Sequence, residues 1–163
     1  MTVRYDEIES PIGPLLVAAD GRGLRRIHFQ VGRHRLRPDP AWRRDASPFR
    51  DLARQLAEYF TRERRVFELP LAPEGTPFQL ETWRALVAIP YGGTISYAEL
   101  ARRVGRPRAV RAVGAANGAN PLPIVVPCHR VIGADGSLTG FGGGLDAKRA
   151  LLELEGALLP TGH

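Results

Sequence analysis

The chain has 163 residues and a net charge of +6; 44% of its residues are hydrophobic, and it holds one cysteine, Cys128. A single cysteine excludes a disulfide scaffold and favours a reducing compartment, while the apolar content is enough for one or two small domains. The sequence shows neither a signal-like apolar start nor the ~20 apolar residues that cross a bilayer, so we expect a cytoplasmic protein without membrane contact.

The first seventy residues predict a small sheet and one helix. Residues 15–19 and 24–29 have the composition of strands, and Asp20-Gly21 is a turn signal between them. Ser47 and Pro48 supply an N-cap and a first-turn proline for a helix that should lie on this sheet. Apolar residues recur in that helix at helical spacing, namely Phe49, Leu52, Leu56 and Tyr59.

A linker follows at 69–75, where proline and glycine are frequent and no hydrophobic period is present. We therefore expect two domains, at 1–75 and 76–163. Directly after the linker, Thr76 and Gln79 have the spacing of a capping box, which predicts a helix from Pro77 to about residue 89.

Two further helices are predicted around a tight turn. Ser96 and Glu99 form a second candidate capping box, and the helix that they open ends before Gly105, with another helix starting near Arg108. This pattern is typical of a helix-turn-helix, in which the second helix enters a nucleic-acid groove, but a plain helical hairpin in a core shows it more often.

The charge of this region favours the first interpretation. Residues 88–134 contain six arginines and one acid. A basic surface of this kind attracts polyanions, although an arginine-rich composition explains it as well. Small residues in the later helix, Ala109, Ala112 and Gly114, would let its backbone approach a nucleic-acid strand or pack tightly against a neighbouring helix.

The only cysteine follows a stiff, apolar segment at 121–127 that contains three prolines. A free thiol with a pKa of ~8.5 is mostly protonated at neutral pH, so a nucleophilic Cys128 needs a base or a cation, for which His129 and Arg130 are candidates. Neighbouring side chains of an extended segment point to opposite faces, so contact with His129 needs a turn or a bridging water. An inert buried cysteine and a papain-like hydrolase are the alternatives.

Two features near the C-terminus complete the candidates. The glycine-rich loop 140–144 can pass close to a ligand and present backbone N–H groups, with Phe141 as an apolar wall. Asp146 is expected to cap a last helix that ends at Gly156. Glu155 lies beside that end, where the helix dipole disfavours an acid.

Taken together, these motifs resemble the O6-alkylguanine-DNA alkyltransferases, also called methylated-DNA–protein-cysteine methyltransferases. The resemblance is carried by residues 111–114, 120–124, 127–132 and 140–144, and it covers about 78–156 closely. It implies an α+β fold: a small N-terminal sheet-plus-helix domain of ribonuclease H-like type, then a mostly helical domain of winged helix-turn-helix type. It also implies no cofactor and no metal, because the zinc-binding cysteines of some members are missing here.

The function that the resemblance implies is direct reversal of DNA damage. A damaged base is flipped out of the duplex, and its alkyl group moves irreversibly to Cys128, so each molecule acts once. The implied substrates are O6-alkylguanine and also O4-alkylthymine in double-stranded DNA. The implied protein is a nucleoid-associated monomer, with cooperative binding along DNA left open.

The resemblance also implies residue roles. His129 holds a water through which the thiol is ionised, and Glu155 orients His129. Asn120 braces the turn that carries the thiol, and the Tyr97 hydroxyl supports the departing guanine. The residues implied to contact substrate or DNA are Arg111, Val131, Phe141, Gly142, Gly143, Arg130, Ala109, Ala112 and Gly114.

Among these, Arg111 would fill the vacated base stack and the Val131 carbonyl would read the guanine amino group. Many relatives have Tyr followed by Ser or Ala where this chain has Phe141-Gly142, which implies a roomier pocket. Two rivals remain: a lesion sensor without chemistry, which generally lacks the cysteine, and a sequence-specific helix-turn-helix regulator.

Overall fold

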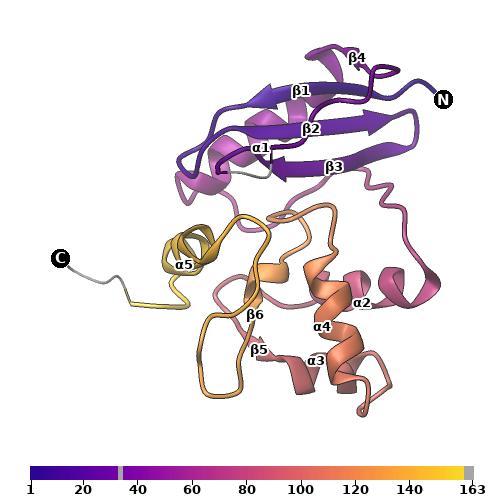
Figure 1. The fold of residues 1–163 in the computed structure, drawn as a ribbon. Coiled ribbons are helices and arrows are strands. Elements are labelled where there is room, and N and C mark those ends of the chain that lie inside the picture. Colours follow the sequence, from indigo (N-terminus) through magenta and orange to yellow (C-terminus); the bar gives the residue numbers. More distant parts are fainter. Residues whose placement is uncertain (33–34, 160–163) are drawn as a thin grey trace. The chain divides into compact units, whose positions relative to one another are not determined.

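The computed structural model describes residues 1–32 and 35–159. The chain forms two compact units, Met1–Glu74 and Gly75–His163 (Figure 1). The first unit is a sheet with a helix and the second is mostly helical, so the predicted α+β class is confirmed. No helix in the described part of the chain is both long enough and apolar enough to cross a membrane.

The first unit is built on a sheet that has four strands within the described residues, in the order β3-β2-β1-β4. The central strand β2 (Leu15–Asp20) pairs antiparallel with β1 (Arg4–Ile8) and with β3 (Gly23–Phe29), and β1 pairs in parallel with the short β4 (Arg43–Arg44). The sequence predicted β2 and β3 but missed the other two strands. The segment of β1 reads as polar, because it is only half-buried.

The turn between β2 and β3 depends on two residues. Asp20 accepts a hydrogen bond from the Arg22 backbone N–H at 2.8 Å, which is an Asx turn. Gly23 has a φ of 149°, and a Cβ there would lie 2.5 Å from the carbonyl oxygen of Pro70. Position 23 therefore requires glycine, because the backbone of Pro70 passes close to it and accepts a hydrogen bond from the Leu24 N–H.

Helix α1 (Arg50–Phe60) contributes its apolar face to the core of the first unit, through Leu52, Leu56 and Tyr59. Its predicted start needs a correction. Ser47 is not the N-cap, because Ser47–Phe49 form a separate 3-10 turn, η1, and the Ser47 hydroxyl donates to Asp45 at 2.8 Å. The carboxylate is the stronger acceptor and organises this entry to the helix.

Three helices form the core of the second unit: α2 (Pro77–Val87), α3 (Tyr97–Arg103) and α4 (Val110–Gly118). The capping box of α2 is present as predicted, with bonds between Thr76 and Gln79 in both directions. The second predicted box is only half formed. Ser96 caps α3, but the Glu99 carboxylate is drawn to Arg102 and Arg103 instead, because an ion pair is the stronger contact.

The rest of the second unit carries the candidate site. The turn η2 (Cys128–Arg130) leads into β6 (Val131–Ile132), which pairs in parallel with β5 (Ile95–Ser96). The last helix, α5 (Leu145–Leu154), is preceded by Gly144 with a φ of 90° and has no side-chain N-cap. Asp146 is thus not the predicted cap; it lies in the first turn, where the dipole favours an acid.

The end of α5 follows the prediction. Gly156 has a φ of 75°, and the Ala157 N–H donates to the Leu152 carbonyl at 2.9 Å. This is the Schellman arrangement, in which a glycine in the left-handed region ends a helix. Glu155 is therefore the C-cap residue of α5, and it is buried in the second unit.

Candidate active site

The thiol is held on a short, buried turn. Cys128 is 6% exposed, and the Arg130 N–H closes the turn on the Pro127 carbonyl at 3.0 Å. The apolar segment before it is buried as well, and Ile124 has a φ of 74°, an uncommon conformation for a β-branched residue. Such a backbone conformation persists only where the surrounding structure fixes it, so the segment that carries the thiol is rigid.

Two asparagines hold this turn to its neighbours. The Asn120 amide donates to the Val126 carbonyl at 2.8 Å and accepts from the Leu122 N–H at 3.0 Å. Asn117, which the sequence reasoning missed, lies on α4 and donates to the Cys128 carbonyl at 3.4 Å. Its side chain is buried, so this contact links α4 to the thiol-bearing turn.

His129 and Glu155 form a pair that is excluded from solvent. His129 Nε2 lies 2.8 Å from Glu155 Oε2, and both side chains have an exposed fraction of 0%. Because a carboxylate only accepts, Nε2 carries a proton toward Glu155, and in the neutral ring Nδ1 is then an acceptor. Nδ1 is buried and has no hydrogen-bond partner among the described residues. It is the available base of the site.

The position of Arg130 corrects its implied role. We expected a contact with substrate or DNA, but the side chain is only 6% exposed. Its guanidinium donates to both oxygens of Glu155, at 2.8 Å and 3.0 Å, and to the Ile89 carbonyl at 2.7 Å, and it lies over the ring of Tyr91. Arg130 therefore supports the carboxylate from within the unit, because an unpaired buried charge would be costly.

Burial shifts the pKa values of both the thiol and the imidazole of the site. Burial raises the pKa of the Cys128 thiol to about 11, against the opposing effects of the Asn120 side chain and the Lys148 charge. Burial also lowers the pKa of His129, and the nearby charges of Arg130 and Lys148 act in the same direction against Glu155. In the resting protein the thiol is therefore protonated and the imidazole is neutral. A neutral base beside a protonated thiol fits general-base activation.

Tyr97 and Val131 lie near the ends of the paired strands. Ile95 is opposite Val131 in the β5-β6 register, and Tyr97 follows directly as the first residue of α3. The Tyr97 hydroxyl donates to the Thr139 carbonyl at 3.3 Å, and the Val131 carbonyl accepts from Lys148 at 2.7 Å. Lys148 was not among the predicted site residues.

Helix α4 presents the residues that were expected to meet DNA. Arg111 and Ala112 are exposed near its start, and Ala109 is the half-buried residue just before the helix. A Cβ added to Gly114 would meet the Tyr97 ring at 3.7 Å, which is an ordinary contact. Packing therefore does not require a small residue at every one of these positions. Ala112 is exposed, and a Cβ would fit beside the Tyr97 ring at Gly114.

The glycine loop is a turn between Phe141 and Gly144, closed by a backbone bond of 3.0 Å. Phe141 and Gly143 are half-buried, whereas Gly142 is exposed and a Cβ there would meet no atom within 4 Å. The space that a larger residue would occupy at Gly142 is open in this chain.

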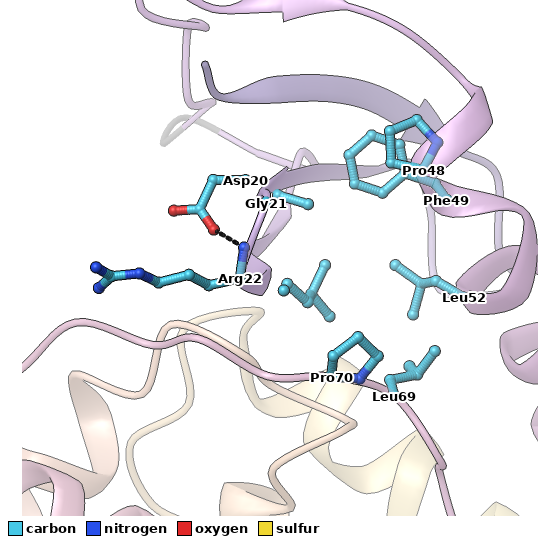
Figure 2. A pocket seen from close by; sticks show the side chains of 11 residues that line it. Asp20, Gly21, Arg22, Pro48, Phe49, Leu52, Leu69 and Pro70 are labelled. Atoms are coloured by element: carbon cyan, nitrogen blue, oxygen red, sulfur yellow. Dashed lines mark hydrogen bonds between the residues drawn. The ribbon is translucent and has the colours of Figure 1, made fainter. Parts of the chain in front are cut away.

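A concavity with a volume of about 220 Å³ lies within the first unit (Figure 2). It is lined by apolar side chains such as Leu52, Leu69 and Pro70, and by the Asp20–Arg22 turn. Apart from Asp20, its lining residues include no side chain that could act as a nucleophile or a base. The hydrogen bond with Arg25 lowers the pKa of Asp20. Cys128 is therefore the better candidate for a nucleophile.

Fold and site together define an α+β protein in which a sheet unit is followed by a helical unit that holds a buried cysteine beside a histidine–glutamate pair. Two family models match it: the DNA binding domain of 6-O-methylguanine DNA methyltransferase over residues 77–157, and the ribonuclease-like domain of the same protein over 3–73. The chain belongs to the 6-O-methylguanine DNA methyltransferase family, which confirms the resemblance found in the sequence.

Individual relatives agree over nearly the whole length. The methylated-DNA–protein-cysteine methyltransferase of Methanosarcina barkeri is 52% identical over 151 residues, which cover 93% of this chain and 96% of that protein. The crystal structure of the Mycobacterium tuberculosis O6-methylguanine methyltransferase has 47% identity and a TM-score of 0.87, covering 99% and 97% of the two chains. The M. tuberculosis OGT in complex with DNA has 48% identity and a TM-score of 0.86, covering 96% and 94%.

Proposed function

We propose that this protein is a methylated-DNA–protein-cysteine S-methyltransferase, which moves the alkyl group of O6-alkylguanine in duplex DNA to its own Cys128. The observation that carries the proposal is the buried turn in which Cys128 adjoins a neutral His129 whose Nδ1 is available as a base. Family membership and the relative crystallised with DNA support DNA as the partner.

The chemistry follows from the protonation states of the resting site. Cys128 begins as a thiol, so its proton must leave toward His129 Nδ1, by way of a water, before or as the substrate reacts. The sulfur then forms a bond to the alkyl carbon while the bond from that carbon to O6 breaks, and the electron pair stays on guanine. Glu155 stabilises the imidazolium that forms, and Arg130 holds the Glu155 carboxylate in place. The thioether product is stable, so each molecule acts once.

The departing guanine needs donors for its negative charge. The Tyr97 hydroxyl would leave the Thr139 carbonyl, a long bond of 3.3 Å, and donate to the base. The sequence resemblance implies that backbone N–H groups of Gly142 and Gly143 lie near the reacting oxygen. The open space at Gly142 favours acceptance of groups larger than methyl.

The reacting carbon is inaccessible within a base stack, so the base must be flipped out at a cost of a few kcal/mol. Arg111, exposed on α4, is the residue that we expect to fill the vacated position. We further propose that the protein acts as a monomer in the cytoplasm on nucleoid DNA, and that O4-alkylthymine is a second substrate.

Intact-mass analysis tests the proposal. After incubation with duplex DNA containing O6-methylguanine, the protein should gain one methyl group in place of one hydrogen, and peptide mapping should locate it on Cys128. The Cys128→Ser variant should bind the same DNA without any gain in mass. Bound DNA with an unmodified wild-type protein would instead favour a lesion sensor, and repeated turnover of an ester would favour a hydrolase.

A further inference from the structure

Thr139 contacts the Tyr97 hydroxyl, although it was not among the predicted site residues. It is an exposed residue between the turn at 133–137 and the glycine loop. Its hydroxyl oxygen and its carbonyl oxygen each lie 3.3 Å from the Tyr97 hydroxyl oxygen. One loop residue therefore makes two polar contacts with the side chain that is proposed to support the departing guanine.

The directions of these two hydrogen bonds follow from the groups that form them. A carbonyl oxygen can only accept, so the Tyr97 O–H donates to the Thr139 carbonyl. The Thr139 hydroxyl must then donate to the Tyr97 oxygen. Tyr97 thus accepts one hydrogen bond while it donates another, and in such a chain each bond polarises the next.

The Thr139 backbone is held in place independently of Tyr97. Lys148 Nζ donates to the Thr139 carbonyl at 2.8 Å, and the turn before it is closed by the Gly133 N–H on the Ser137 carbonyl, also at 2.8 Å. The Thr139 carbonyl therefore keeps a charged donor when the Tyr97 hydroxyl turns away from it. Because no acceptor is left unpaired, this release of Tyr97 costs little free energy.

We propose that Thr139 is a positioning residue for the leaving group, which keeps its hydroxyl bond to Tyr97 while the Tyr97 O–H turns from the Thr139 carbonyl to the guanine. This inference rests on the proposed function. The bond from Thr139 withdraws electron density from the Tyr97 oxygen, so the Tyr97 O–H becomes a stronger donor to the negative charge on the departing base. At 3.3 Å the bond is longer than the usual ~2.8 Å, so it can shorten as that charge develops.

Single-turnover transfer from duplex DNA containing O6-methylguanine tests this role. Thr139→Val removes the hydroxyl with little change in side-chain volume and should slow transfer about fivefold, the usual net contribution of one hydrogen bond. Thr139→Ser keeps the hydroxyl and should recover the wild-type rate. The matched control is Thr94→Val, which removes a hydroxyl from another exposed threonine of the same unit and should leave the rate unchanged.

Two further comparisons separate this role from a general loosening of the site. In the Tyr97→Phe background the Thr139 hydroxyl has lost its partner, so Thr139→Val should cause no additional loss. Iodoacetamide alkylates Cys128 without a guanine leaving group, so wild type and Thr139→Val should react with it at equal rates in the absence of DNA. A slower reaction of the variant with iodoacetamide, or an equal loss in both backgrounds, would overturn the proposal.

Failure of this proposal and failure of the proposed function give different results. A wild-type protein that gains no methyl group from the lesion-bearing duplex would reject the proposed function, and the role of Thr139 with it. Equal transfer rates for wild type and Thr139→Val would reject the role of Thr139 alone. Fluorescence anisotropy should show equal binding of the duplex by both proteins, and weaker binding by the variant would likewise contradict a role in leaving-group departure.

Discussion

Arg130 donates through two nitrogens to the two oxygens of Glu155, at 2.8 Å and 3.0 Å, while Glu155 also accepts from His129. The guanidinium and the carboxylate match in geometry, and neither faces solvent. The carboxylate is therefore shared between a cation that fixes it and an imidazole that it orients. This places a structural ion pair directly behind the proposed base.

Replacement of Arg130 by methionine should destabilise the fold rather than weaken DNA binding selectively. Removing one partner of a buried ion pair leaves the other charge uncompensated, at about 3–5 kcal/mol. Urea unfolding measures this loss. The matched control is Arg111→Met, at an exposed position of α4, which should change the free energy of unfolding by less than about 0.5 kcal/mol. Similar small losses for both variants would show that Arg130 is not a structural support.

The free energy of unfolding should fall as the pH rises above the ordinary thiol pKa. Cys128 has a pKa of about 11 in the folded chain, against ~8.5 for a free thiol. Below pH ~8.5 both states hold the proton and the full stability is present; between these values only the unfolded chain releases it, which costs about 1.4 kcal/mol for each pH unit.

Urea unfolding of wild type and Cys128→Ala between pH 7 and pH 10 isolates this effect, because all other groups titrate alike in the two proteins. The wild type should lose about 2 kcal/mol more than the variant over this range. Parallel pH dependences would mean that the thiol is not held in its protonated form by burial.

Substitution of Tyr97 by phenylalanine should slow transfer from duplex DNA by about 100-fold, because the departing guanine loses one donor for its charge. Binding of the same duplex should change little, as the ring remains. Tyr91→Phe is the control: it also removes one hydroxyl, which donates to the Leu154 carbonyl at 3.3 Å. Single-turnover rates measure both, and a normal rate for Tyr97→Phe would exclude a role in leaving-group stabilisation.

Arg111→Ala should separate base flipping from chemistry. Only a duplex must be opened, so loss of the residue that fills the stack should reduce transfer from duplex DNA by about 100-fold, equivalent to a few kcal/mol of unstacking. Reaction with the free base O6-benzylguanine should change less than about twofold. Arg103→Ala removes the same charge from an exposed position of α3 and should affect duplex repair far less. Equal losses on duplex and free base would remove the proposed role of Arg111.

The sequence by itself determined the helical elements around the site and the nucleophile. Pro77, Thr76 and Gly156 act on their own few residues, through fixed φ, a capping hydroxyl and the left-handed region, so their effects are readable locally. A single cysteine beside a histidine is likewise visible without a fold. Polar β1 gave no such signal, since its pairing depends on a neighbouring strand.

Only the tertiary structure decided which charges enter the interior. Arg130 is one of many arginines, and Lys148 lies 20 residues after Cys128 in the sequence. The residues around each of them give no sign that the side chain is buried. The chain folds α5 against η2, and this brings Glu155 to Arg130 and His129, and Lys148 to the Val131 carbonyl. Burial then raises the pKa of the Cys128 thiol to about 11. Desolvation is a property of the assembled core, which no short stretch of sequence contains.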